Sequence, residues 1–125
     1  MSMKIPEHLQ YTKEHEWLSI DGGTIRIGIT DYAQDQLGDI VFVELPEVGA
    51  ELDEGDVFAE VESTKSVGEV YAPVAGVVTA RNESLMDTPE LVNQDPYDTG
   101  WLIEMSVEDG PADLLTAAAY RELTE

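Results

Sequence analysis

The feature that most constrains the fold of this chain is a succession of short strand-like runs separated by turn residues. Most runs alternate apolar with polar or small residues, and Gly, Asp and Pro interrupt them at short intervals. We expect strands over residues 16–20, 24–29, 40–45, 56–61, 67–72, 76–81 and 100–107. Strands this short and this closely spaced indicate a small barrel or sandwich. A chain of 125 residues can build one sizeable core, so we expect a single domain over residues 1–125.

Local patterns add detail to this outline. The run over residues 40–45 is almost continuously apolar, which predicts a buried strand. Thr30 or Asp31 can cap a short helix that Gly38 would end. Thr88, followed by a proline at the first helical position, predicts a one-turn helix. A final segment rich in Ala and Leu predicts a C-terminal helix over about residues 111–123.

The formal charge of -21, from 27 acidic and 6 basic residues, excludes several function classes. Nucleic acids and anionic membranes are bound by clustered Lys and Arg, which this composition does not provide. An acidic excess of this size keeps a protein dispersed in salt, which suggests a salt-adapted host. The apolar content of 42% still predicts a folded chain.

The sequence contains no cysteine, so it offers no disulfide, no thiolate metal site and no catalytic thiol. Any sulfur chemistry must come from a group that the chain carries. The first residues form neither an apolar signal region nor an Arg-rich presequence, and no stretch has the length of a membrane span. We therefore expect a cytoplasmic protein.

Lys65 is the residue whose placement most needs an explanation. It is the only Lys or Arg between Arg26 and Arg81, in a segment rich in Asp and Glu. It lies where one strand-like run stops and the next begins, so we expect it near the apex of a hairpin over about residues 56–72. The β-branched Thr64 disfavours the positive φ of the common two-residue turns, so the apex needs a less favoured turn or a longer loop.

Three roles are open for this lysine. It could be a solvated side chain that blunts an exposed turn. It could be a Schiff-base nucleophile, but that role needs a lowered amine pKa, and carboxylates such as Glu62 and Glu69 would raise it. It could also be a covalent attachment point, for which a modifying enzyme needs an exposed amine on a rigid turn.

Several motifs make the third role specific. Residues 62–66 read ESTKS and are continued by EVYAPVAG at 69–76. Further motifs, in order, are YTKEHEW at 11–17, GITDYAQ at 28–34, GDIVFVELP at 38–46, TPELVN at 88–93, DPY at 95–97 and GW at 100–101. Over nearly the whole chain they resemble the H proteins of the glycine cleavage system, with Lys65 in the lipoylation segment. Ser66 and Gly68 differ from the Ala and small hydroxyl residue usual in that family, which concerns fine contacts only.

The resemblance implies a mainly β barrel-sandwich hybrid, the hammerhead fold of lipoyl and biotinyl carriers, with a few short helices and a C-terminal helix. It implies that Lys65 carries (R)-lipoate in amide linkage. Such an arm reaches about 12 Å, enough to enter a partner's active site. In this family the loaded arm can fold into a cleft of the carrier, where Glu16 and Glu69 match positions for polar contacts to the cationic amine.

The implied protein is a carrier and not an enzyme. It receives the aminomethyl group of glycine from a glycine decarboxylase (P protein) and delivers it to an aminomethyltransferase (T protein). Dihydrolipoamide dehydrogenase (L protein) then reoxidises the dithiol, and a separate enzyme attaches the lipoate. We expect a monomer without nucleic acid or membrane partners and without a metal site. His15 is interpreted as a structural or surface side chain, and Trp17 and Trp101 as core or rim aromatics.

Other functions are weighed against this one. A biotin carrier normally has methionines beside its lysine, and a lipoyl domain of a 2-oxoacid dehydrogenase has Asp before it and a flexible linker. A lipoyl or octanoyl relay in lipoate metabolism is not separated from glycine cleavage by the sequence. A small enzyme using the acids of residues 53–56 is a different class, but acids in a glycine turn of so acidic a chain are mostly solvated. A structural interaction module leaves Lys65 unexplained.

Overall fold

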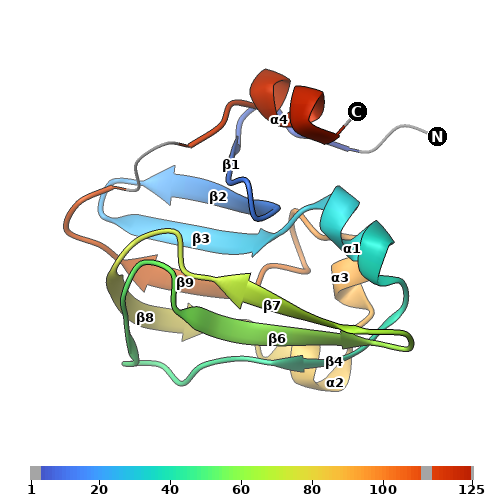
Figure 1. The fold of residues 1–125 in the computed structure, drawn as a ribbon. Helices are drawn as coiled ribbons and strands as arrows, with labels where there is room; N and C mark the ends of the chain where they lie inside the picture. Colours follow the sequence, from blue (N-terminus) through green and yellow to red (C-terminus); the bar gives the residue numbers. More distant parts are fainter. Residues whose placement is uncertain (1–3, 111–113, 125) are drawn as a thin grey trace.

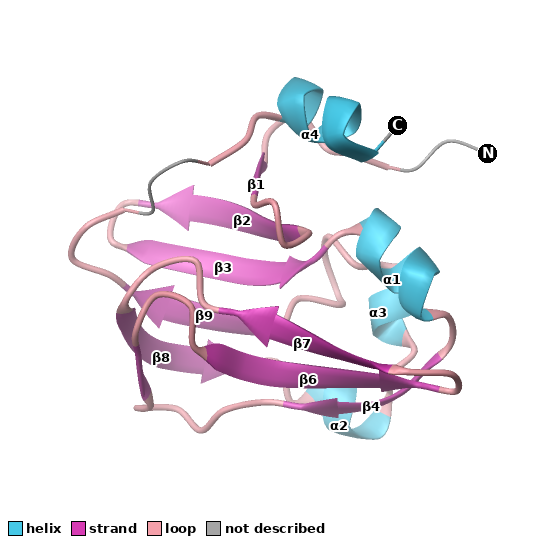
Figure 2. Cartoon of the chain, in the orientation of Figure 1, coloured by secondary structure: helices cyan, strands magenta, loops and turns pink. Residues whose placement is uncertain are grey.

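The structure, a computed structural model, describes residues 4–110 and 114–124. It is mainly β, with a few short helices and a C-terminal helix, which confirms the predicted fold class (Figures 1 and 2). The larger of two antiparallel sheets has the strand order β1 (Gln10–Tyr11), β2 (Glu16–Asp21), β3 (Thr24–Ile29), β9 (Ile103–Ser106), β8 (Gly76–Arg81) and β5 (Glu51–Leu52). The smaller sheet has the order β4 (Ile40–Glu44), β6 (Val57–Ser63) and β7 (Val67–Tyr71). The described strands thus form two antiparallel sheets.

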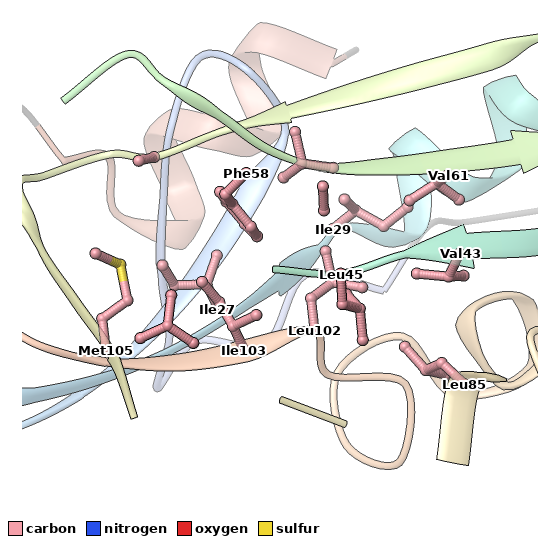
Figure 3. Close-up of a cluster of buried hydrophobic side chains, with 14 of the residues drawn as sticks. Ile27, Ile29, Val43, Leu45, Phe58, Val61, Leu85, Leu102, Ile103 and Met105 are labelled. Atoms are coloured by element: carbon pink, nitrogen blue, oxygen red, sulfur yellow. The ribbon is translucent and has the colours of Figure 1, made fainter. Parts of the chain in front are cut away.

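The main hydrophobic core lies between the two sheets. Successive residues of a strand point to opposite faces, so each strand turns one set of its side chains toward this core. The larger sheet contributes Ile27 and Ile103, and the smaller sheet contributes Val43 and Val61, all fully buried. Figure 3 shows these side chains in the space between the strands.

A second buried cluster lies on the other face of the larger sheet, under helix α4 (Ala117–Thr124) (Figure 1). Tyr11 of β1 and Tyr120 of α4 stack with ring centroids 4.8 Å apart and an interplanar angle of 11°. Trp17 belongs to this cluster and donates from Nε1 to the carbonyl of Pro96. The C-terminal helix is therefore packed on the sheet by aromatic contacts.

Helix α1 (Asp31–Leu37) has the termini that the sequence predicted. The Thr30 side chain accepts a hydrogen bond from the Ala33 amide, which makes it the N-cap. Gly38 ends the helix with a φ of 89°, a conformation that favours glycine.

The C-terminal helix begins later than the sequence predicted. Of the expected span 111–123, residues 111–113 lie outside the described residues, and the helix starts only at Ala117. Leu115 instead pairs with Tyr11, each amide donating to the other's carbonyl at 2.9 and 2.7 Å. This long-range pairing overrides the local helix preference of the segment.

The short helices also differ from the prediction. A one-turn helix is present, but it is α3 (Leu91–Gln94) and its N-cap is Glu90, not Thr88. Helix α2 (Ser84–Asp87) precedes it and was not predicted. Thr88 instead ends α2, because its amide donates to the Ser84 carbonyl at 2.8 Å.

Strand β4 is less buried than its apolar sequence predicted. Val41 and Phe42 are 53% and 46% exposed. The ladder to β6 is irregular between Ile40 and Phe42, and the packing around β4 leaves both side chains about half exposed.

We expect Gly28→Ala to lower the free energy of unfolding by about 1–3 kcal/mol, because it overpacks a fixed contact. Gly28 pairs with Trp17, and a Cβ at this position would lie 2.5–2.7 Å from atoms of the indole ring. Urea denaturation would measure the change. Gly23→Ala is the matched control, since its Cβ would meet only the Val107 carbonyl oxygen at 3.4 Å. Equal stability of both variants would contradict the packing described for Trp17.

Candidate attachment site

The β6–β7 hairpin presents Lys65 at its apex. The two strands pair in the register Glu60 with Glu69, Val61 with Gly68 and Glu62 with Val67. The apex projects past the ends of the larger sheet (Figure 1), and Lys65 is exposed.

The turn is closed by the side chain of Ser63. The Ser63 amide donates to the Ser66 carbonyl at 2.8 Å, while the Ser66 amide donates to the Ser63 hydroxyl oxygen at 3.0 Å. The Lys65 amide approaches the same oxygen at 3.3 Å. A common two-residue turn would need positive φ, and among the described residues other than glycine only His15 has one. The serine hydroxyl thus allows a tight turn that the β-branched Thr64 can accept.

The Lys65 side chain lies toward the end of α1. The Thr64 amide donates to the Asp39 carbonyl at 3.2 Å, which ties the apex to the segment after α1. A Cβ on Gly38 would lie 3.2 Å from Lys65 Cε and 3.9 Å from its Nζ. Glycine at this position therefore leaves room for the lysine stem.

Between α1 and β7 lies a small cleft of about 190 Å³, which we call the arm cleft. One wall is α1 with Tyr32 and Leu37, the other is β7 with Gly68 and Glu69, and His15 with its neighbour Glu14 also lines it. A Cβ on Gly68 would lie 3.0 Å from a Leu37 methyl carbon, so glycine permits this close approach of β7 and α1.

Two carboxylates lie at the arm cleft. Glu69 and Glu14 are exposed and both line it. Glu69 Oε1 accepts from the Tyr71 hydroxyl at 3.3 Å, and the charge of Glu69 raises the pKa of Tyr71. Glu14 was not singled out from the sequence, because no local pattern distinguishes it from the many other acids and only the fold brings it beside β7.

Glu16 lines a second cleft. It is 1% exposed, and this larger cleft of about 820 Å³ shares Glu14 with the arm cleft but does not include Glu69. Glu16 Oε1 accepts from the Thr12 hydroxyl at 3.1 Å, and its Oε2 accepts from the Tyr71 amide at 2.7 Å. Burial raises the pKa of Glu16 to about 7, although both hydrogen bonds oppose this shift. The side chain connects β2 to the end of β7, at the base of the hairpin.

The remaining candidate residues take part in packing or in local hydrogen bonds. Trp17 is a core side chain, and Trp101 is half-buried with the Arg26 guanidinium 4.6 Å above its ring. Asp53 and Asp56 are exposed, and the Asp56 carboxylate accepts from the Asp53 amide at 2.8 Å within their turn. Within residues 4–110 and 114–124, no group of three or more His, Asp or Glu side chains could hold a metal ion. No helix in the same part of the chain is long and apolar enough to cross a membrane.

A small β-sandwich that displays one lysine at a hairpin apex beside a cleft has the architecture of a swinging-arm carrier. Comparison with known proteins identifies which carrier family this is. The sequence model of the family described as "Glycine cleavage H-protein" matches residues 9–125. The crystal structure of a glycine cleavage system H protein from Mycobacterium marinum is similar with a TM-score of 0.88 and 41% identity, covering 94% of this chain and 97% of that one.

Individual sequences agree with this match. A glycine cleavage system H protein of Staphylococcus haemolyticus (strain JCSC1435) is 54% identical over 123 residues, which cover 97% of this chain and 98% of that protein. One of Mycobacterium avium (strain 104) is 57% identical over 129 residues, with the same coverage of 97% and 98%. The chain belongs to the glycine cleavage H-protein family. Members of this family are lipoyl carriers that catalyse no step themselves, as the sequence predicted.

The raised pKa of Glu16 predicts a measurable pH dependence of stability. Because the pKa rises from 4.5 to about 7 on folding, the folded chain binds this proton more tightly than the unfolded chain. The contribution is fully present below about pH 4.5 and is lost as the pH rises to about 7, by up to about 3 kcal/mol. We expect the difference in unfolding free energy between the wild type and Glu16→Gln to change by this amount over that window and to stay constant above it.

Urea denaturation at a series of pH values would measure this difference. Glu44→Gln is the control for removing one exposed acid from so acidic a chain. A difference between wild type and Glu16→Gln that does not vary with pH would show that Glu16 is not a desolvated ionisable group.

Proposed function

We propose that Lys65 carries lipoate in amide linkage to its Nζ and that the chain serves as the mobile-arm carrier of the glycine cleavage system. The observation that carries this proposal is the display of Lys65 at a stiff apex, with its stem against Gly38 and beside the arm cleft. The hydrogen bonds of Ser63 and Thr64 fix the backbone on both sides of the lysine. Only the side chain and its attached group then need to move.

The residues present fit such a group. When bound, lipoate supplies a disulfide that takes up the aminomethyl group together with two electrons. The arm cleft begins at Leu37 and Gly68, within the reach of about 12 Å of an arm attached at Lys65. Acylation of Nζ removes the positive charge of the lysine, so Lys65 itself then does not compete for the acids of the cleft.

Glu69 and Glu14 suit a cationic cargo. An aminomethyl group on the arm is protonated, and the two exposed carboxylates at the cleft attract it. Glu16 supports the site indirectly, because its hydrogen bond to the Tyr71 amide holds the strand that carries Glu69. The cleft thus retains the loaded arm between visits to other proteins.

The partners of this function are the glycine decarboxylase, the aminomethyltransferase, dihydrolipoamide dehydrogenase and the enzyme that attaches lipoate. A protruding arm enters each active site while the body of the carrier stays outside. The expected location of the chain is the cytoplasm. Support for the partner set comes from the family to which the chain belongs.

Lys65→Arg should abolish both the modification and the function. Arg keeps the positive charge but lacks the amine that forms the amide bond. After growth with lipoate, the intact mass of the wild type should include one lipoyl group, and that of the variant should not. Glycine-dependent bicarbonate exchange with a matched decarboxylase should follow the same pattern, whereas Lys13→Arg should behave like the wild type. Equal exchange by Lys65→Arg would refute the attachment site.

Glu69→Gln should shorten the retention of the loaded arm. The arm can be loaded without the decarboxylase: formaldehyde and ammonium condense with a thiol of the reduced, lipoylated protein, which forms the aminomethyl group with loss of water. Hydrolysis of the loaded arm then releases ammonia, and the rate of this release is measured. Loss of one exposed carboxylate should speed that release by up to about fivefold. Glu60→Gln is the matched control, since Glu60 is the cross-strand partner of Glu69 but does not line the arm cleft. Release that is unchanged in Glu69→Gln, or equally fast in both variants, would contradict this role.

A further inference from the structure

His15 lines the arm cleft in a conformation that the backbone alone does not favour. Its φ is 68°, in the left-handed region, which costs a non-glycine residue about 1 kcal/mol or more. Such a conformation persists only where the surroundings hold it. The His15 carbonyl accepts from the Thr30 amide at 3.1 Å, and the ring packs on Tyr32 with centroids 4.8 Å apart.

The other contact of the His15 ring comes from the C-terminal helix. Nδ1 lies 2.8 Å from the hydroxyl oxygen of Tyr120, a fully buried residue of α4 that does not line the arm cleft. The same hydroxyl lies 2.7 Å from Oγ1 of Thr30, the N-cap of α1. One tyrosine oxygen therefore joins His15 to the helix that forms a wall of the cleft.

The direction of these hydrogen bonds follows from the burial of Thr30. Thr30 is 0% exposed, and its Oγ1 already accepts from the Ala33 amide. Its own proton needs an acceptor, and Tyr120 is the acceptor within hydrogen-bond distance among the described residues. The Tyr120 proton must then point to Nδ1 of His15. An imidazole that accepts at Nδ1 is neutral and carries its proton on Nε2.

The charge balance of the cleft agrees with this arrangement. The groups that face the cleft near His15 are Glu14, Glu69 and the Tyr32 ring. Burial lowers the pKa of His15, although the charge of Glu14 opposes the shift. A neutral imidazole leaves the negative charges of Glu14 and Glu69 available to a cation, whereas an imidazolium would cancel part of them.

We propose that Tyr120 is a positioning residue for the arm cleft: its hydroxyl holds His15 as the neutral Nε2–H tautomer against Tyr32, so that the cleft retains a cationic arm. This inference rests on the proposed function. The C-terminal helix lies on the opposite side of the larger sheet from the main core. The inference gives this helix a role in how long a loaded arm stays protected.

The test compares two variants that each remove one buried hydroxyl from the same aromatic stack. Tyr120→Phe removes the bond to His15 but keeps the ring that stacks on Tyr11. Tyr11→Phe is the matched control, because the Tyr11 hydroxyl donates to the Pro6 carbonyl at 2.6 Å and has no contact with the cleft. Thermal unfolding of both variants reports any general loss of stability.

The first readout is the ¹⁵N spectrum of the imidazole in the full lipoylated chain. A His8→Asn background removes the second of the two histidines and leaves one ring to observe. We expect a single Nε2–H tautomer in the wild type and in Tyr11→Phe, and a mixture of tautomers in Tyr120→Phe. The inference would be overturned if His15 of the wild type were not the Nε2–H tautomer, or if its tautomer were unchanged in Tyr120→Phe.

The second readout is the release of ammonia from the loaded arm. Tyr120→Phe loses the hydrogen bond to His15, so we expect its loaded arm to release ammonia about fivefold faster than the wild-type arm. The rate of release from Tyr11→Phe should equal that of the wild type. If the wild type is protected and Tyr120→Phe is protected equally, the inference about Tyr120 fails while the proposed function stands. If Lys65 carries no lipoyl group, or if the wild-type arm releases ammonia as fast as free aminomethyl-dihydrolipoamide, the proposed function fails and this inference falls with it.

Discussion

The hydroxyl of Ser63 closes the turn that carries Lys65, and the geometry of the site depends on it. By accepting from the Ser66 amide, it takes the place of a backbone carbonyl and removes the need for positive φ at Thr64 and Lys65. The Thr64 amide is then free to donate to Asp39, which fixes the apex relative to α1. The lysine stem lies over Gly38 as a consequence, at the entrance to the arm cleft.

The base of the same hairpin is held by a different interaction. Glu16 reaches from β2 and accepts from the Tyr71 amide at the end of β7. Because Glu16 is buried, this bond is shielded from water and from the salt that screens the many surface acids. The hairpin is therefore anchored at its apex by neutral hydrogen bonds and at its base by a buried acid. Glu14 and Glu69, the acids that line the arm cleft, remain exposed.

Much of this architecture could be predicted from local patterns. The alternating runs gave the mainly β class, and the signals at Thr30 and Gly38 gave both ends of α1. The errors came where long-range contacts decide. The pairing of Leu115 with Tyr11 delays the start of the C-terminal helix. The irregular ladder between β4 and β6 leaves Phe42 about half exposed in a run that was predicted to be buried. Neither the pairing of Leu115 nor the irregular ladder leaves a signal in the residues nearby along the chain.

The sequence by itself determined that Lys65 stands at the apex of a hairpin, because two adjacent strands and the residues between them are contiguous in the chain. Only the tertiary structure decided what surrounds the lysine. The arm cleft combines His15, Tyr32 and Glu69, and the buried Tyr120 hydroxyl contacts the His15 ring. The tertiary structure also gives Glu14 and Glu16 different surroundings, although they are two residues apart: Glu16 is buried and accepts from the Tyr71 amide, whereas Glu14 is exposed and lines both clefts. The physical reason is that burial, close packing and hydrogen-bond partners at such a site depend on distances in space, whereas local patterns report only on neighbours along the chain.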